Sequence, residues 1–209
     1  MADTAFSDPR AAWDARFSAP GLLFGAEPNA FLKREAARLA HASHVLSVAD
    51  GEGRNAIHLA ALGHQVQAFD VSPVAVAKAR EWAAQRAVGA TFTVSGVDEW
   101  PWTPDAFDAV VAVFVQFADP EMRARMFNGI WRTLKPGGLV LVQGYTPKQL
   151  EYRTGGPGRL DHLYTPAMLR ALLPQAEWLL LREHEAELDE GSAHHGRSAL
   201  IDAVARKPD

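Results

Sequence analysis

The sequence VLSVADGEGRN, residues 45–55, joins a short apolar run to a turn that contains two glycines. A second apolar run, residues 66–69, follows about one βαβ unit later and ends at Asp70. The apolar runs are typical of buried strands, and residues 54–62 between them, closed by Gly63, predict a helix. Strand, glycine turn, helix, strand and acid, in that order, are typical of a site that holds an adenosine-containing ligand. Two large enzyme classes share this arrangement.

Predicted strands and helices alternate through most of the chain. Ser72-Pro73 begins one helix, as its N-cap and its first helical residue. The expected strands are 45–49, 66–69, 91–94, 107–114 and 139–143, and the expected helices are 31–42, 54–62, 74–86 and 121–134. Because these strands are almost wholly apolar, they predict a parallel sheet that helices cover on both faces.

The end of the chain departs from this alternation. Residues 178–188 and 198–206 predict two strands separated by Asp189-Glu190-Gly191, which suits an antiparallel pair at the end of the sheet. Glutamates at 183, 185 and 187 fall on one face of the first strand, where they predict a solvated edge. We therefore expect one α/β domain, residues 1–209, with a doubly wound, Rossmann-like, mostly parallel seven-stranded sheet and a C-terminal antiparallel strand pair.

The composition fits one folded domain and narrows its partners. Of 209 residues, 48% are hydrophobic and 22% charged, which is ordinary for a globular protein. A formal net charge of −4 leaves no basic stripe for a nucleic acid. The chain has no cysteine, which excludes disulfides and thiolate metal sites. Residues 1–16 hold no apolar run suited to a signal peptide or a membrane span, so we expect a cytoplasmic protein, monomeric or homodimeric.

The glycine loop favours one of the two enzyme classes. Gly51-Glu52-Gly53-Arg54-Asn55-Ala56 matches the pattern G-x-G-x-x-G/A of NAD-dependent dehydrogenases. A pyrophosphate, however, sits on backbone amides at a helix N-terminus, where the acids Asp50 and Glu52 would repel it. S-adenosylmethionine has no phosphate, and carboxylates suit its α-ammonium group. Asp70 can accept the ribose hydroxyls in either class, so the choice of S-adenosylmethionine depends on the loop.

A second turn makes the pattern more specific. Leu134-Lys135-Pro136-Gly137-Gly138 ends a helix and leads directly into the apolar run 139–143, about 80 residues after the glycine loop. In these features the chain resembles class I S-adenosylmethionine-dependent methyltransferases. Over nearly its whole length it is similar to the small bacterial tellurite-resistance-type methyltransferases. The segments that carry this likeness are 13–17 (WDARF), 24–29 (FGAEPN), 51–55 (GEGRN), 62–66 (LGHQV), Asp70, 145–147 (YTP), 154–157 (TGGP) and 203–207 (AVARK).

The resemblance implies an enzyme that uses S-adenosyl-L-methionine to methylate a small-molecule acceptor of thiol, chalcogenide or hydroxyl type. Three positions depart from the family pattern. Ser47 replaces the acid that opens the loop, Ala49 replaces its first glycine, and Gly96 stands where many members have an acid. These departures keep open a protein that binds S-adenosylmethionine without catalysis. A NAD(P)-dependent oxidoreductase is a further and less favoured alternative.

The expected cofactor site combines the loop with a lid and the ends of neighbouring strands. Residues 1–30, which their prolines and glycines are expected to keep irregular, would form the lid, although their aromatic residues suit plain packing onto the body equally well. In the lid, Arg16 would pair with the methionyl carboxylate, and Phe24 or Trp13 would face the sulfonium. The cofactor-binding residues expected are Arg16, Phe24, Ala49, Asp50, Gly51, Glu52, Gly53, Arg54, Asn55, Asp70, Val71, Val97 and Phe114.

The acceptor side is expected at residues 145–165, where the stretch 152–158 is too rich in glycine for regular structure. Tyr145 and Gln116 follow predicted strands and would position the acceptor, but Gln116 suits a helix cap equally well. His195 is the third candidate catalytic residue, as a general base taken from the pair His194-His195. Adjacent residues of a strand point to opposite faces, so this pair alone predicts no metal site.

Overall fold

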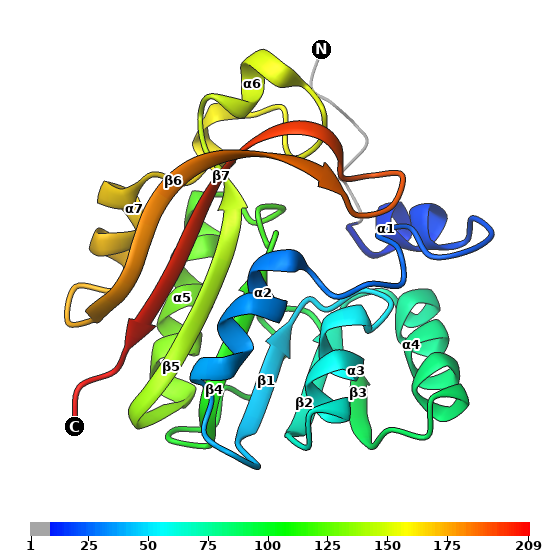
Figure 1. The fold of residues 1–209 in the computed structure, drawn as a ribbon, viewed down its shortest axis with the longest axis horizontal. Helices are drawn as coiled ribbons and strands as arrows, with labels where there is room; N and C mark the ends of the chain where they lie inside the picture. Colours follow the sequence, from blue (N-terminus) through cyan, green and yellow to red (C-terminus); the bar gives the residue numbers. More distant parts are fainter. Residues whose placement is uncertain (1–8) are drawn as a thin grey trace.

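The computed structural model describes residues 9–209 as a seven-stranded sheet with helices on both faces (Figure 1). The strands are β1 (His44–Val48), β2 (Gln65–Asp70), β3 (Ala90–Val94), β4 (Phe107–Val113), β5 (Leu134–Tyr145), β6 (Glu177–Asp189) and β7 (His195–Arg206). Their order in the sheet is β3-β2-β1-β4-β5-β7-β6. Strands β1 to β5 pair in parallel, while β7 is antiparallel to both β5 and β6. The predicted seven-stranded, mostly parallel α/β sheet with antiparallel pairing at its C-terminal end is confirmed.

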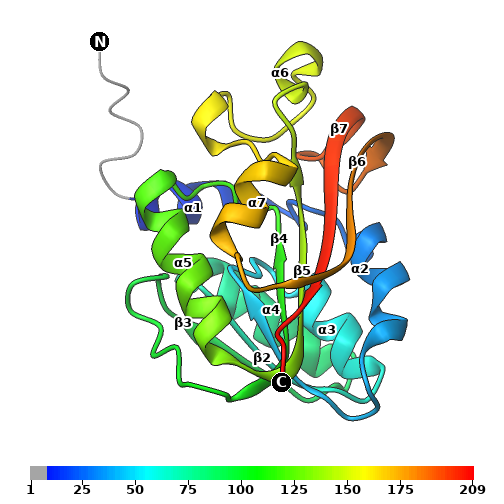
Figure 2. The same ribbon diagram turned by 90° about the vertical axis from the view of Figure 1, so that its left-hand side faces the viewer.

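Helices cover the two faces of the sheet, as Figure 2 shows edge-on. Helices α2 (Ala30–Glu35), α3 (Arg54–Ala61) and α4 (Pro73–Gln85) pack on one face, and α5 (Pro120–Thr133) and α7 (Pro166–Leu172) pack on the other. The short helix α6 (Gln149–Tyr152) lies beyond the carboxyl ends of the parallel strands (Figure 1). Within residues 9–209 no helix is long and apolar enough to cross a membrane.

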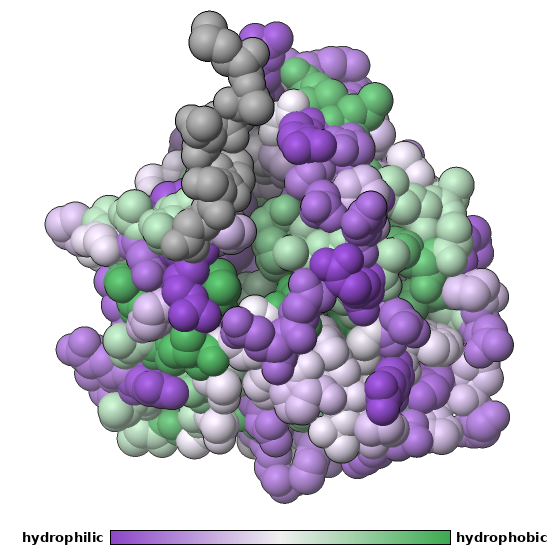
Figure 3. Space-filling model, turned by 180° about the vertical axis from the view of Figure 1, so that it is seen from behind, coloured by the Kyte–Doolittle hydropathy of each residue, from purple (hydrophilic) through white to green (hydrophobic). Residues whose placement is uncertain are grey.

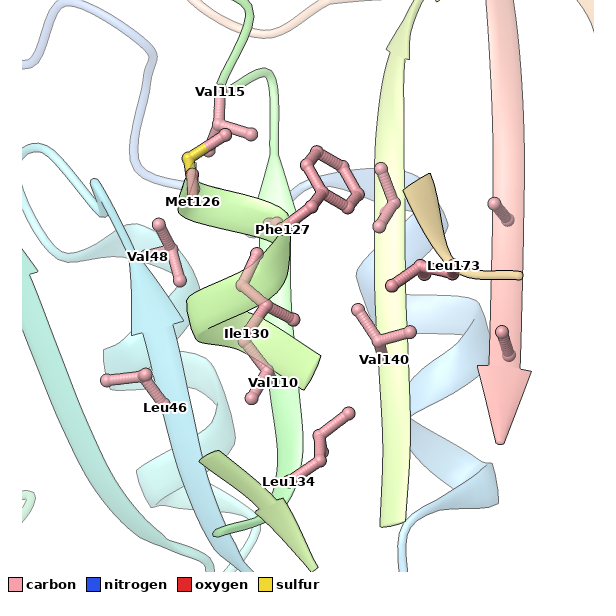
Figure 4. Close-up of a cluster of buried hydrophobic side chains, with 14 of the residues drawn as sticks. Leu46, Val48, Val110, Val115, Met126, Phe127, Ile130, Leu134, Val140 and Leu173 are labelled. Atoms are coloured by element: carbon pink, nitrogen blue, oxygen red, sulfur yellow. The ribbon is translucent and has the colours of Figure 1, made fainter. Parts of the chain in front are cut away.

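The larger core lies between the sheet and α5 (Figure 4). Met126, Phe127 and Ile130 lie on one face of α5 and are fully buried. They pack against strand residues such as Leu46 and Val110, which are fully buried as well. This packing holds the parallel strands in register, and their carboxyl ends therefore form one well-defined edge where a ligand can bind.

Two local predictions were wrong. Residues 9–17, expected to be irregular, form helix α1 (Pro9–Phe17), in which only Phe17 is buried. With one buried side chain, the helix has no periodic apolar face that a sequence could show. The helix expected at 31–42 ends at Glu35 and continues only as a 3₁₀ turn, Ala36–Arg38.

Candidate functional site

Three alternating positions shape the glycine loop between β1 and α3. Ala49, Gly51 and Gly53 have φ angles of +48°, +60° and +91°. At Gly53 a Cβ would lie 2.8 Å from the Cβ of Ala79, so α4 leaves room only for glycine. Ala49 takes the left-handed conformation with a methyl group, at a cost of about 1–2 kcal/mol. The loop therefore has the tight backbone that a ligand can approach closely.

Ser47 replaces the acid expected at the start of the loop, but Asp50, three residues later, supplies a carboxyl group. The hydroxyl of Ser47 donates to the carboxylate of Asp50 at 2.5 Å, and the amide of Ala56 lies 3.4 Å from the same carboxylate. Burial raises the pKa of Asp50 to about 7, and the charge of Asp70 adds to the rise against these hydrogen bonds. Position 50 thus holds a carboxyl group that is half ionised near neutral pH.

Asp70 ends β2 at the edge of the sheet and is buried. One carboxylate oxygen accepts from the amide of Gly51 and the other from that of Ser72, both at 2.9 Å. The next residue, Val71, is partly buried beside it. Burial raises the pKa of Asp70 against these two hydrogen bonds. The amide of Val71 contributes a further hydrogen bond to this carboxylate, and because a carboxylate has about four lone-pair sites, Asp70 still has acceptor capacity for a ribose.

The loop after β3 has few side chains to offer a ligand. Val97 is buried, and its carbonyl accepts from the indole nitrogen of Trp102 at 2.8 Å. The amide of Gly96 donates to the carboxylate of Glu99 at 3.0 Å. Glu99 therefore brings a carboxylate to the region where Gly96 itself cannot.

Glu52 turns away from the loop and binds the segment between α1 and α2. One of its oxygens accepts from the amide of Leu23 at 2.7 Å, and the other from the ammonium group of Lys78 at 3.0 Å. The same ammonium donates to the carbonyls of Ala19 and Gly21. An ion pair of the loop thus fastens residues 19–23 over it.

Arg54 and Asn55 continue this attachment. The guanidinium of Arg54 donates to the carbonyl of Phe24 at 3.0 Å and to the carboxylate of Glu190 at 2.7 Å. The side-chain oxygen of Asn55 accepts from the amide of Asn29 at 3.0 Å. The side chains of residues 52, 54 and 55 therefore hold the segment before α2, and the loop residues 51–56 are buried beneath it.

Helix α1 reaches the same edge of the sheet. The ring of Phe17 lies 3.3 Å from the position of a Cβ on Gly51, and the hydroxyl of Ser72 donates to the carboxylate of Asp14. The guanidinium of Arg16 stacks on the ring of Trp13 at 4.4 Å. Residues 9–29 therefore lie directly over the loop, although the first eight residues of the predicted lid lie outside the described part.

An aromatic cluster stands at the carboxyl ends of β4 and β5. The ring of Phe114, a residue with φ +55°, lies 4.8 Å from that of Tyr145 and 4.2 Å from that of His194. The ring of Phe24 also lies near His194, at 4.7 Å. Non-glycine residues in the left-handed region are often strained residues of a functional site.

Two polar atoms of this cluster are buried without a partner among residues 9–209, the hydroxyl of Tyr145 and Nδ1 of His194. Burial raises the pKa of Tyr145. Burial also lowers the pKa of His194 to about 3, and the charges of Arg54 and Arg16 add to the fall. Both side chains are therefore neutral at physiological pH and can form hydrogen bonds with a ligand.

His195 and Gln116 are placed differently from Tyr145. His195 is exposed, with its ring 3.3 Å from the carboxylate of Asp189, and is not part of the cluster. The amide of Gln116 bonds both the N–H and the C=O of Tyr145 and also the carbonyl of His162. Gln116 thus fixes the backbone of Tyr145, while the cap of α5 is Asp119. The pair His194-His195 was the only signal in the sequence for His194. Adjacent strand residues point to opposite faces, but the sequence does not say which of the two rings faces inward.

Within residues 9–209 no three His, Cys, Asp or Glu residues gather in a way that could hold a metal ion. Figure 3 shows the molecule from behind, where hydrophobic surface gathers in a hollow near the centre of the face. The hollow lies at the level of the carboxyl ends of the parallel strands in Figure 1.

The unusual carboxyl group of Asp50 predicts a pH-dependent stability. Folded Asp50 keeps its proton up to about pH 7, whereas an unfolded aspartate loses it near pH 4. The folded state binds more protons between these values, so the free energy of unfolding falls as the pH rises from 4 to 7. Asp50→Asn removes this loss, which is worth about 1.4 kcal/mol per pH unit. In urea unfolding, the variant should gain stability over the unaltered protein between pH 5 and pH 8. Equal pH dependence of the two proteins would show that Asp50 ionises normally.

Comparison with known proteins shows which domain the central part of the chain resembles. Residues 45–138 match a family model described as a methyltransferase domain. The tRNA N(3)-methylcytidine methyltransferase Mettl2 of Drosophila melanogaster is 29% identical over 96 residues, which are 38% of this chain. That match spans only 30% of the length of the relative.

Solved structures share the whole fold. N-methyltransferase NodS from Bradyrhizobium japonicum WM9, in complex with S-adenosyl-L-homocysteine, superposes with a TM-score of 0.73 at 15% identity, covering 96% of this chain and 98% of that one. TehB from Haemophilus influenzae superposes with a TM-score of 0.69 at 16% identity, covering 95% of this chain and 66% of that one. Residues 45–138 therefore resemble a methyltransferase domain, and the chain as a whole shares the fold of these solved structures.

Proposed function

We propose that the protein transfers the methyl group of S-adenosylmethionine to a small-molecule acceptor of thiol, chalcogenide or hydroxyl type. The observation that carries the proposal is the position of the His194 cluster, at the ends of β4, which adjoins the strand before the glycine loop, and of β5 beyond it. Donor and acceptor would meet at one edge of the sheet, under residues 9–29 as the lid and residues 145–165 as the acceptor side. A site enclosed in this way suits a small acceptor better than a polymer.

The chain's own residues suit the task of holding the reactants in line. When bound, S-adenosylmethionine supplies an electrophilic methyl group on its sulfonium. Asp70 would hold the ribose hydroxyls, the carbonyl and carboxylate oxygens of the loop the α-ammonium of the methionyl end, and Val71 and Val97 the adenine side. Arg16 lies near enough to His194 to affect its pKa, so it would place positive charge beside the methionyl carboxylate. Such positioning is worth about 7–11 kcal/mol in favourable cases.

The acceptor would enter in an ionised form. A histidine whose pKa is about 3 is a weak base at neutral pH, so His194 would bind the acceptor and would not remove a proton from it. The charge of Arg16 near His194 favours an anion, such as a thiolate or chalcogenide, over a neutral alcohol, whereas the charge of Arg54 is already paired with Glu190. His195, exposed and paired with Asp189, is a base in this proposal only if the β6–β7 turn moves.

A nucleic-acid acceptor is the second candidate, because the Drosophila relative is named for its action on tRNA. Against it, the formal net charge of −4 gives little counterion release on a phosphate backbone. The two candidates, and a protein that binds the cofactor without catalysis, differ in what they do with an acceptor.

Calorimetric titration tests the cofactor first, with S-adenosylmethionine, S-adenosylhomocysteine and NADH in parallel. We expect micromolar binding of the two sulfur ligands and none of NADH; the reverse would establish an oxidoreductase. Methyl transfer from labelled S-adenosylmethionine is then measured with thiols, selenide, phenols and tRNA. Transfer to tRNA alone would replace the small-molecule proposal, and binding without any transfer would indicate a non-catalytic protein.

A further inference from the structure

The turn between β6 and β7 carries a carboxylate that binds the first turn of α3. Glu190 accepts from the guanidinium of Arg54 at 2.7 Å, and both side chains are less than 10% exposed. The same carboxylate accepts from the side-chain amide of Asn29 at 3.0 Å and from the backbone amide of Ala30 at 3.2 Å. One buried carboxylate therefore joins the glycine loop, the start of α2 and the β6–β7 turn.

The same turn holds the histidine of the aromatic cluster. The amide of Glu190 donates to the carbonyl of His194 at 2.9 Å, which closes the turn. The ring of His194 then packs on Phe114 and Tyr145. The position of Glu190 thus determines where the ring of His194 lies.

Backbone packing fixes the turn against the segment over the loop. Gly191 has φ +73°, and a Cβ on it would lie 2.5 Å from the amide nitrogen of Gly25 and from the carbonyl oxygen of Leu23. The same segment is bound by the glycine loop: Glu52 accepts from the amide of Leu23, and Arg54 donates to the carbonyl of Phe24. The glycine loop, residues 23–25 and the β6–β7 turn are therefore each in contact with the other two.

A displacement of the loop must pass to the turn through this contact. Arg54 directly follows Gly53, so an adjustment of the loop around a ligand shifts the backbone that carries this side chain. Leaving that cation buried without its carboxylate is unfavourable, and the pair therefore moves together. The donor side and the acceptor side of the site are joined by one ion pair.

We propose that Glu190 is a positioning residue that couples the cofactor loop to His194, so that cofactor binding sets the acceptor side before the acceptor enters. This inference rests on the proposed function, because it takes the loop as the cofactor site. It gives the reaction an order: S-adenosylmethionine binds first, and the acceptor binds to the site that results.

Hydrogen exchange read by mass spectrometry tests the coupling, with S-adenosylhomocysteine as the probe. In the unaltered protein, saturating probe should slow exchange both in the loop, residues 49–55, and in the turn, residues 189–196. In Glu190→Gln, which removes the charge and keeps the size, protection of the turn should be lost while that of the loop remains. The affinity for the probe should fall about tenfold. Glu187→Gln, a change of the same kind on the exposed face of β6, should behave like the unaltered protein.

A second pair of variants reaches the same contact without altering a charge. Gly191→Ala puts a methyl group into the backbone of residues 23–25, and it should also uncouple the turn from the loop. Gly63→Ala is its matched control, since Gly63 has φ +91° but nothing within 4 Å of its Cβ position. Both substitutions place a Cβ on a residue with a left-handed backbone. Only Gly191→Ala also forces the β6–β7 turn away from residues 23–25.

The outcomes separate this inference from the function on which it rests. Failure of the unaltered protein to bind S-adenosylhomocysteine overturns both. Binding with equal protection of the turn in Glu190→Gln and Gly191→Ala overturns the coupling alone. If Glu190→Gln does not fold, Gly191→Ala against Gly63→Ala decides the question.

Discussion

Asp70→Asn is expected to weaken the binding of S-adenosylhomocysteine about a hundredfold. The substitution keeps the shape of the side chain and one acceptor for the amides of Gly51 and Ser72, but removes the charge that would hold two ribose hydroxyls. A hydrogen bond to a charged group is worth about 1.5–3 kcal/mol, and a loss of about 3 kcal/mol corresponds to two decades in Kd. Isothermal titration calorimetry measures the change directly.

The matched control for this prediction is Asp108→Asn, near the amino end of β4 and therefore at the end of the parallel strands opposite to Asp70. Asp108 also accepts a backbone amide, that of His44 at 2.8 Å, and pairs with Lys135 at 2.7 Å. Its replacement should leave the affinity within twofold. If Asp70→Asn also binds S-adenosylhomocysteine within twofold of the unaltered protein, Asp70 does not hold the ribose.

Phe127→Ala is expected to lower the free energy of unfolding by about 3–5 kcal/mol. Phe127 is fully buried between α5 and the sheet, as Figure 4 shows, and its ring meets that of Tyr164 edge-on at 6.1 Å. Truncation leaves a cavity that the rigid sheet cannot fill. Denaturation with urea measures the loss.

Leu160→Ala is the control for the core variant, because Leu160 is 62% exposed. It should change the stability by no more than about 0.5 kcal/mol. A loss below about 1 kcal/mol for Phe127→Ala would mean that α5 can collapse into the space, and that the core is less tightly packed than the structure has it.

The fold followed from local patterns, because the central parallel strands β1, β4 and β5 are buried along most of their length and therefore appear in the sequence as apolar runs. Residues 107–114 illustrate this, since the prediction exceeds the observed β4 by Phe114 alone. Helix α1 could not be found in this way. Its one buried residue, Phe17, packs on Gly51, and contact with a distant loop leaves no period in the sequence.

The candidate site was harder to predict from the sequence than the fold, for the same reason. The types of residue in the loop indicated a ligand, but the partners of its side chains lie far away in the chain. Arg54 pairs with Glu190, 136 residues further on, and Glu52 binds Leu23, 29 residues earlier. Which of two adjacent histidines faces inward depends on the register of β7 with β6, and that register is set by turn geometry.

The alanine at position 49 has a consequence for how such proteins are found. Residues 49, 51 and 53 share one handedness of backbone, yet only two of the three are glycine. A text search that demands three glycines would discard this chain, whereas a search for three alternating left-handed residues after a buried strand would keep it. Homologues would have to share the left-handed backbone conformation at these three positions. Glycine is the residue that adopts this conformation with the least steric strain, but it is not required at each of them.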